Sequence, residues 1–469
     1  MIKARLATEK DLKDVRKIWD YCFNDPEEYA DYYFQKRYKP NNNVVVELDG
    51  EIVSSVQLSP FKMKLGENEY DASYVIGVST LPEARSKGCM KEMLTYSLNE
   101  LYARNIYISI LMPIDYRIYK RYGYENCYDL MRYEISTNDL KNFKQTGDFK
   151  KIDFAKEVDN QEIEELICFV RKYQENLNAD NIRDERYFER VFDALSLKCF
   201  KNNFYILKED ENKSIENKNS SGCKKNKDCN EYTKNSTKQN VYTEESGEVK
   251  NNIKGYIIYS IDDGVMNVSE LVYNSPTSLK SLLGFIYNHN TQCKIVKIKA
   301  PVNNKIRFVL DNPLDAKMSI AHFMTGRIIN VVEFFKTLKP NFNLKSNTKY
   351  SDVELGVANF GVKSNTDYKY KKEHSIILKV KDNQIEANNK TFEITIQDES
   401  ISVEIANKNA EIDIELSINQ LSQIGFSYLS VEEVISYCEV YIKEDRKNDV
   451  VEFFNLLFKK RINYIEDYD

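Results

Sequence analysis

One stretch of the sequence, Val75–Met93 (VIGVSTLPEARSKGCMKEM), constrains the fold more than any other. An apolar run ends at Val78, a basic turn follows at Arg85–Gly88, and apolar residues then recur at helical spacing from Met90. We therefore predict a strand, a tight turn and a helix. Such a turn directs several backbone N–H groups to one point at the positive end of the helix dipole, which suits a phosphate.

The residues of the turn fit this role, although a plainer interpretation is open. Gly88 allows close approach of the backbone, and Arg85 and Lys87 add positive charge. The alternative is an ordinary strand-to-helix connection with a solvated basic edge, because short glycine motifs also match by chance.

The elements around the turn predict a mixed α/β domain. The predicted order is helix, hairpin, strand, basic turn, helix, strand and a Tyr-rich segment. A capping box at Thr8–Asp11 and helical spacing over 12–22 predict the first helix. A turn at Asp49-Gly50 between the runs 44–48 and 52–58 predicts the hairpin, and an apolar run at 106–111 predicts the last strand.

Two motifs together resemble a known family. The turn resembles the acetyl-CoA pyrophosphate loop, (Q/R)-x-x-G-x-(G/A), of GNAT-type N-acetyltransferases, with Met90 in the sixth position. Downstream, Ile118–Tyr124 reads IYKRYGY. The string I-Y-x-R-(F/Y)-G-Y at this distance from R-x-x-G resembles the Eis (enhanced intracellular survival) family of GNAT enzymes. The resemblance is good over residues 1–135 and looser, as domain order, beyond them.

This resemblance implies acetyl-CoA as a co-substrate and a set of residues that contact it. They belong to the end of the first strand, to the turn, and to the segment after the next strand: Val78, Ser79, Thr80, Arg85, Ser86, Lys87, Gly88, Cys89, Met90, Lys91, Ile114 and Asp115. Ile114 departs from the small residue that is usual in the family.

The resemblance implies that Tyr119 is the general acid, because it holds the first aromatic position of the IYKRYGY motif, where the family places its acid. A phenol with a pKa of about 10 is protonated at neutral pH and can donate to a leaving thiolate. Tyr116, Tyr122 and Tyr124 are close competitors, and most of the 33 tyrosines must serve packing or the surface.

The resemblance also implies the base, since in the Eis family the C-terminal carboxylate enters the active site. Here that group is the α-carboxylate of Asp469, whereas the family typically ends in an aromatic residue. The alternative is a frayed acidic tail.

Phe23, Asp25 and Glu28 are the predicted substrate residues, since Cys22–Asp25 is similar to a Phe–Asp pair at the family's substrate mouth. Acidic groups there would attract a cationic amine. They equally fit a helix start with Pro26 at its first position, and Phe23 equally fits the core.

The chain of 469 residues is too long for one ordinary core, and we predict three domains. Residues 1–149 form the catalytic GNAT domain. We predict that residues 150–326 form a degenerate GNAT domain, because its turn at Asn274–Leu279 lacks the basic motif. Within this domain, the segment 209–252 has few large aliphatic residues and is predicted to be a disordered insertion. We predict that residues 327–469 form an α+β domain that resembles a sterol carrier protein. Helical spacing predicts helices over 328–338, 431–439 and 450–457, and period-two runs at 392–396, 401–405 and 412–418 predict an antiparallel sheet.

Composition narrows the class of protein. A net charge of −6 gives no global basic field for nucleic acid. Nine cysteines without C-x-x-C pairs fit reduced thiols in a cytoplasmic protein. The start of the sequence does not read as a signal peptide, no apolar run is long enough for a membrane, and the three histidines show no metal-ligand spacing.

The sequence therefore predicts an acetyl-CoA-dependent N-acetyltransferase that acts on a primary amine by direct attack. The resemblance implies aminoglycoside-, polyamine- or lysine-like acceptors and a hexamer. The alternative is a ligand- or lipid-binding protein that uses the sterol-carrier-like domain, with the GNAT fold as a scaffold or an acetyl-CoA sensor.

Overall fold

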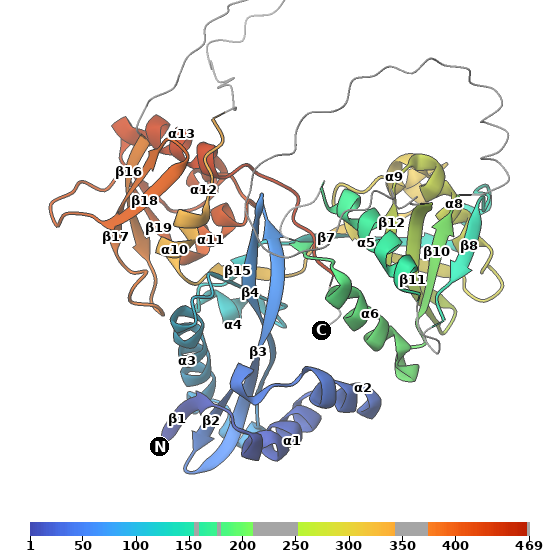
Figure 1. Ribbon diagram of the computed structural model, residues 1–469, viewed down its shortest axis with the longest axis horizontal. Helices are drawn as coiled ribbons and strands as arrows, with labels where there is room; N and C mark the ends of the chain where they lie inside the picture. The colour runs from blue at the N-terminus through green and yellow to red at the C-terminus, as the bar shows by residue number, and fades with distance from the viewer. Residues whose placement is uncertain (154–158, 176–179, 210–251, 343–373, 467–469) are drawn as a thin grey trace, which may run out of the picture. The chain divides into compact units, whose positions relative to one another are not determined.

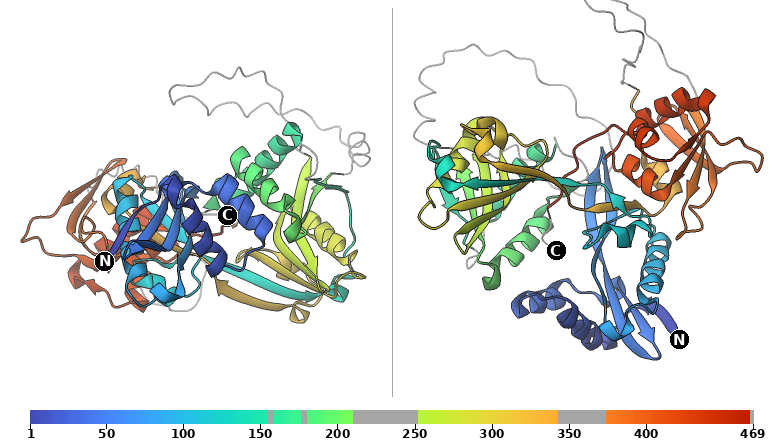
Figure 2. Two further views of the ribbon diagram at one scale, coloured as in Figure 1. Left: turned by 90° about the horizontal axis from the view of Figure 1, so that it is seen from below. Right: turned by 180° about the vertical axis from the view of Figure 1, so that it is seen from behind.

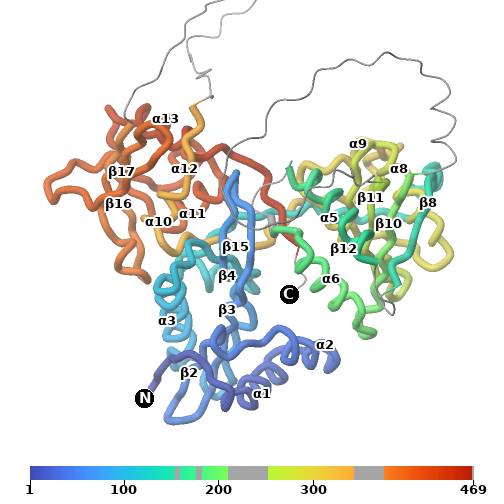
Figure 3. The backbone as a smooth tube through the Cα atoms, in the orientation of Figure 1, coloured from blue at the N-terminus to red at the C-terminus, as the bar shows by residue number. Residues whose placement is uncertain are grey.

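The structure, a computed structural model, describes residues 1–153, 159–175, 180–209, 252–342 and 374–466 (Figures 1 and 3). Apart from its end residues, Glu209 and Asn252, the predicted insertion lies outside these ranges. The chain divides into two compact units. The first takes in residues 1–130, 180–182, 320–342 and 374–466, and the second takes in residues 131–153, 159–175, 183–209 and 252–319.

The first unit is built on a sheet in the order β1-β2-β3-β4-β5-β15-β6, with β9 paired to β3. Its elements are β1 (Ile2–Leu6), α1 (Leu12–Cys22), α2 (Glu27–Tyr32), β2 (Asn43–Leu48), β3 (Glu51–Leu65), β4 (Asn68–Thr80), α3 (Cys89–Ala103), β5 (Ile108–Leu111), α4 (Tyr116–Lys120), β6 (Glu125–Asn126), β9 (Asp180–Asn181) and β15 (Thr325–Ile328). The predicted order of elements through the Tyr-rich segment is confirmed.

Helices cover both faces of this sheet (Figure 1). Because successive side chains of a strand point to opposite faces, Val44 and Val46 pack with α3 while Val45 packs with α1. Trp19 and Val15 of α1 are buried as their spacing predicts, but Leu12 is 38% exposed.

The second unit repeats this layered arrangement around a sheet in the order β14-β7-β13-β12-β11-β10-β8 (Figure 2). Tyr256 and Ile258 of β11 pack with α5 and α6, and Ile257 and Tyr259 pack with α8. The elements are β7 (Asp129–Ser136), β8 (Asp148–Lys151), α5 (Asn160–Gln174), α6 (Glu185–Ser196), β10 (Asn203–Lys208), β11 (Ile253–Asp262), β12 (Val265–Tyr273), α8 (Pro276–Tyr287), β13 (Ile295–Pro301), α9 (Ile306–Val309) and β14 (Lys317–His322).

A third sheet, in the first unit, has the order β18-β17-β16-β19-β20. It is formed with its helices by α10 (Val331–Thr337), β16 (His374–Lys381), β17 (Thr391–Gln397), β18 (Ser400–Ile405), β19 (Ile414–Ser417), α11 (Ile418–Gly425), α12 (Val431–Tyr437), β20 (Tyr441–Ile442) and α13 (Lys447–Leu457). The prediction of an antiparallel sheet is wrong at one place, since β16 and β19 pair in parallel.

The predicted helix over 328–338 also begins too early. Ile328 ends strand β15, where it pairs with Ile108 of β5, and the helix starts at Val331. The predicted boundary between residues 326 and 327 thus falls within β15, and the three-domain division stays a prediction. None of the helices in the described ranges has the length and apolar character to span a bilayer.

A buried ion pair ties β15 to the third sheet. Arg327 and Asp382, both without exposed side-chain surface, pair at 2.7 Å from Nη2 to Oδ2. Arg327 also donates to the carbonyl of Tyr122, beside Gly123. A Cβ atom added to Gly123, which has φ +83°, would overlap Nη1 of Arg327 and lie 2.7 Å from its Cζ. Only glycine fits between this turn and the guanidinium.

We predict that Gly123→Ala lowers the free energy of unfolding by about 3–5 kcal/mol, because it displaces one partner of a buried ion pair. Gly50→Ala is the matched control: Gly50 also has a positive φ but open space around it, so about 1 kcal/mol of backbone strain is expected. Urea unfolding measures both. Equal losses would contradict the packing role of Gly123.

Candidate active site

The basic turn leaves the start of α3 open to solvent. Ser86 and Gly88 adopt left-handed backbone conformations with φ +62° and +94°, and Arg85 to Gly88 are exposed. Gly88 is the N-cap residue, and no side chain caps the helix. The first bond of the helix runs from the N–H of Glu92 to the Gly88 carbonyl, so the N–H groups of the first turn lack helical partners.

Strands β4 and β5 diverge next to this turn. They pair in parallel from Ala72 with Ile108 to Val75 with Leu111, whereas β4 continues to Thr80. Beyond Val75, the edge of β4 that faced β5 no longer pairs with it. Arg85 Nε donates to the Thr80 carbonyl at 3.1 Å, which ties the turn to the end of the strand.

A β-bulge shapes β4 at the same point. Ile76 pairs with Gln57 and Ser79 pairs with Ser55, so Gly77 and Val78 together face one residue of β3. Gly77 has φ +64°, and a Cβ atom there would lie 2.6 Å from Cζ3 of Trp19. The Trp19 ring of α1 therefore packs directly against the bulge at Gly77, where no side chain would fit.

Tyr119 lies buried at the end of α4, just after β5. Burial, with the nearby Tyr124, raises the pKa of Tyr119 to about 12. Among the described residues, its hydroxyl has no hydrogen-bond partner. The hydroxyl of Tyr124, by contrast, is 2.9 Å from Ser109 Oγ.

The two residues predicted after β5 are placed differently from one another. Ile114 is 86% exposed. Asp115 caps α4 through the N–H of Arg117 and forms an ion pair with its guanidinium at 2.6 Å, which lowers the pKa of Asp115. The carboxylate of Asp115 is therefore already engaged within the protein.

The predicted substrate residues lie between α1 and α2 and in the first turn of α2. Asp25 accepts a hydrogen bond from Trp19 Nε1 at 3.1 Å; partial burial raises the pKa of Asp25, and the bond from Trp19 opposes the rise. The ring of Phe23 packs 4.8 Å from that of Trp19, in agreement with a core role. Glu28 is exposed on α2.

The predicted base, Asp469, lies outside the described residues, but the segment before it is anchored in the first unit. Asn463 donates to the carbonyls of Cys127 at 2.8 Å and of Phe426 at 2.9 Å. Tyr464, Ile465 and Glu466 are buried. Up to Glu466, the chain is therefore packed into the first unit next to β6 and is not a frayed tail.

Comparisons with known proteins agree with this geometry. Residues 3–127 match an acetyltransferase (GNAT) domain, residues 225–328 match a second one, and residues 364–465 match a sterol carrier protein domain. The chain is an acetyltransferase. The predicted fold, two GNAT domains and a C-terminal sterol-carrier-like domain, is confirmed. No curated protein matches the chain.

Several solved structures share the fold of this acetyltransferase over its whole length. A conserved protein of unknown function from Enterococcus faecalis, a probable N-acyltransferase, has a TM-score of 0.74 at 19% identity, with 100% of both chains covered. A GCN5-related N-acetyltransferase from Anabaena variabilis has a TM-score of 0.70 at 16% identity, and Eis1 from Mycobacterium abscessus has 0.64 at 11%, again covering 100% of both chains.

The second GNAT domain repeats the divergence of strands but not the open turn. Its β12 and β13 pair in parallel only from Val265 to Val268 of β12, which runs on to Tyr273. The helix α8, however, starts directly after the strand and is capped by Ser275, which accepts from the N–H of Ser278 at 3.1 Å. This helix start is occupied by the protein's own side chains.

The residues of the first domain fit acetyl-CoA. An added Cβ atom on Gly88 would find no other atom nearer than 3.8 Å, so a phosphate could approach the backbone there. The turn and the N–H groups of Cys89, Met90 and Lys91 would hold the pyrophosphate. The open edge of Val78–Thr80 would pair with the amide groups of pantetheine. The bound co-substrate would supply the activated acetyl group.

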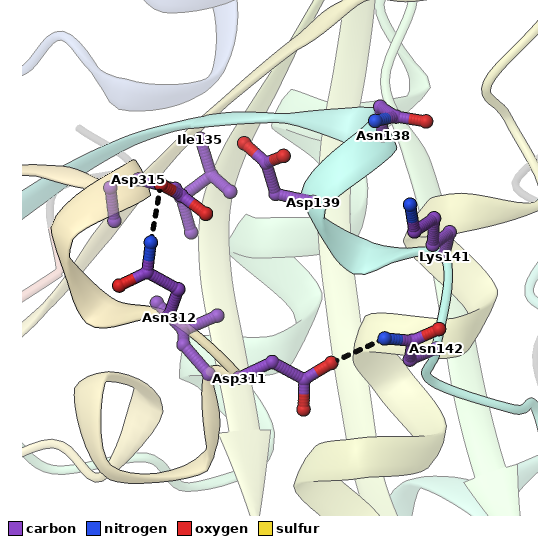
Figure 4. Close-up of a pocket in the computed structure, with 10 residues that line it drawn as sticks. Ile135, Asn138, Asp139, Lys141, Asn142, Asp311, Asn312 and Asp315 are labelled. Atoms are coloured by element: carbon purple, nitrogen blue, oxygen red, sulfur yellow. Dashed lines mark hydrogen bonds between the residues drawn. The ribbon is translucent and has the colours of Figure 1, made fainter.

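A pocket in the second unit lies between the segment 135–142 and the segment 310–316 (Figure 4). Four of its polar side chains form two hydrogen-bonded pairs: Asn142 Nδ2 donates to Asp311 at 2.6 Å and Asn312 Nδ2 donates to Asp315 at 2.7 Å. It is separate in sequence from every motif described above.

Sequence reasoning missed a polar cluster beside α4, since it considered the histidines only for metal-ligand spacing. His322 Nδ1 is 2.7 Å from Asp129 Oδ1, and Tyr428 donates to the other oxygen of Asp129 at 2.7 Å. The His322 ring packs edge-on against Tyr116, with 5.8 Å between ring centres. These residues are far apart in sequence, and no local pattern brings them together.

We predict that Gly77→Ala destabilises the first domain by roughly 2–4 kcal/mol, because the new Cβ atom forces the Trp19 ring away and strains a left-handed residue. Trp19 is the only tryptophan, so its emission should shift to longer wavelength. Gly264→Ala, with φ +76° and open space, is the control. Unchanged emission in Gly77→Ala would contradict the fitted bulge.

Proposed function

We propose that the chain is an N-acetyltransferase of the Eis type, which transfers an acetyl group from acetyl-CoA to a primary amine by direct attack. In this proposal the first GNAT domain holds acetyl-CoA, Tyr119 is the general acid, and the α-carboxylate of Asp469 is the base. The matches to GNAT domains and the fold shared with Eis1 support the class of reaction.

The observation that carries the proposal is the open N-terminus of α3 beside the divergence of β4 and β5. An anion at this helix start would meet free N–H groups and the positive end of a dipole. The contrast with α8, whose start is capped by Ser275, supports a co-substrate site in the first domain rather than the second.

The environment of Tyr119 suits an acid. A phenol whose pKa is raised to about 12 keeps its proton at neutral pH, and its hydroxyl is not committed to a described partner. Tyr124, the competitor in the same motif, is held by Ser109.

The base assignment draws support from the anchored tail. Asn463 fixes the chain beside Cys127, and Tyr464, Ile465 and Glu466 after it are buried. A primary ammonium of the lysine type has a pKa of about 10.4 and must lose a proton before it attacks a thioester, so a carboxylate base gives the terminus a chemical role.

The proposed acceptor class draws support from the acidic residues near α2. Asp25 and Glu28 would attract a cationic amine, and in this proposal Phe23 contributes to the same substrate site. By family resemblance we propose an aminoglycoside-, polyamine- or lysine-like acceptor, and a hexamer. A cytoplasmic location stays a prediction of the sequence.

The alternative of a lipid carrier gains no support from the third sheet. Its inward side chains are packed rather than arranged around a space: Leu378, Phe392 and Ile394 are at most 1% exposed and belong to one core with Phe334 and Phe453.

The proposal is tested by release of CoA from acetyl-CoA in the presence of a panel of polyamines, aminoglycosides and lysine derivatives. We expect release that depends on at least one amine, with mass spectrometry showing one added acetyl group on that amine. Release at the same rate without any amine would overturn the proposal.

We predict that Tyr119→Phe lowers kcat by about 100-fold or more while acetyl-CoA still binds, since general acids typically contribute this much. Because a raised pKa keeps the acid form present to higher pH, the wild type should not lose rate through this group below pH 10. A tyrosine of ordinary pKa would already be half deprotonated there. Normal turnover of the variant would remove Tyr119 from the acid role.

Deletion of Tyr468 and Asp469 should lower kcat by about 100-fold, with the remaining rate rising at high pH where the amine deprotonates unaided. Asp469→Asn is the matched control, since it keeps the α-carboxylate and should keep most of the activity. Full activity of the deletion would show that the tail takes no part in the reaction.

A further inference from the structure

Side chains from later in the sequence bind the segment that follows Tyr119, in addition to the segment's own backbone hydrogen bonds. Asn419 Nδ2 donates to the carbonyl of Lys120 at 3.0 Å and to that of Tyr124 at 3.1 Å. Gln384 Nε2 donates to the carbonyl of Arg121 at 3.3 Å, and Arg327 donates to that of Tyr122. Four carbonyls of the motif thus accept from side chains that lie beyond residue 326.

The donors are themselves fixed. Asp382, which pairs with Arg327, accepts from Asn388 Nδ2 at 2.9 Å and from the backbone N–H of Gln384 at 2.9 Å. Gln384 also accepts from Thr95 Oγ1 of α3 at 2.8 Å. The loop after β16 therefore contacts both the helix of the phosphate turn and the tyrosine motif.

These contacts reach Tyr119 through the backbone. The carbonyl of Tyr119 accepts from the N–H groups of Tyr122 at 2.9 Å and Tyr124 at 3.4 Å. Helix α4 has only 5 residues, and so short a helix has little stability of its own. The orientation of the Tyr119 side chain consequently depends on the turn at 120–124, and that turn depends on Arg327, Gln384 and Asn419.

We propose that Asn419, Gln384 and the Arg327–Asp382 pair are positioning residues for the general acid, and that the sterol-carrier-like domain supports the catalytic segment. This inference rests on the proposed role of Tyr119. It gives this domain a function in the acetyl transfer itself: Asp382, Gln384 and Asn419, all within residues 364–465, hold Arg327 and the turn after Tyr119, and so keep the phenol at one place relative to the acetyl-CoA turn.

The test uses the full chain with both amides truncated, Asn419→Ala/Gln384→Ala. These side chains are half-buried, so the fold should persist, which thermal unfolding checks. We expect kcat to fall about 10-fold, with the acetyl-CoA dissociation constant and KM unchanged. Asn455→Ala, on α13, is the matched control, because its amide binds Glu432 within the same domain and should leave kcat unchanged.

The decisive comparison repeats the double truncation in a Tyr119→Phe background. If the amides act by positioning Tyr119, the truncation lowers kcat little further there. A full 10-fold fall in both backgrounds, or no fall in the wild type, would overturn the positioning role.

Failure of the proposed function would be recognised separately, because Tyr119→Phe alone would then turn over normally. Arg327→Lys provides a second route to the same conclusion: lysine cannot reach Asp382 and the Tyr122 carbonyl together, so kcat should fall with acetyl-CoA affinity kept. Unchanged kcat in a folded Arg327→Lys variant would contradict the proposal.

Discussion

The limited pairing of two parallel strands shapes the candidate site of the first GNAT domain. Strands β4 and β5 pair only as far as Val75 and Leu111, after which β4 runs on to Thr80 with β3 as its remaining strand partner. A strand edge left open in this way needs another partner for its backbone groups. Since α3 begins just beyond it with an uncapped N-terminus, one region offers both an edge for amide groups and a site for phosphates.

The same constraint shows why two related domains need not share an activity. The second domain repeats the parallel pair and its divergence, but its connection to α8 is too short for a phosphate turn, and Ser275 satisfies the helix start. The chemistry therefore depends on the loop, whereas the layered arrangement depends on the alternation of apolar residues along the strands. The GNAT fold by itself would suggest acetyl-CoA in both domains. The two domains differ in that α3 starts without a side-chain cap, whereas α8 is capped by Ser275.

Local features of the sequence predicted much of this structure. The capping box at Thr8, the hairpin at Asp49-Gly50, and the strand, turn and helix around Arg85–Gly88 all depend on neighbouring residues, and all are present. Strand β15 could not be predicted, because its pairing partners lie in β5 and β6, about 200 residues earlier, and its apolar residues also fit a helix. The Arg327–Asp382 pair and the Asp129–His322 contact could not be predicted either, because in each the two partners lie far apart in sequence.

Calorimetric titration of the full chain with acetyl-CoA tests whether the first GNAT domain alone holds the co-substrate, as we propose. We expect one molecule bound per chain, with binding lost in Arg85→Glu/Gly88→Glu. Binding should be kept in Thr277→Glu, which places a negative charge at the exposed start of α8. No binding by the wild type, or binding that survives the first variant and is lost in the second, would contradict the account.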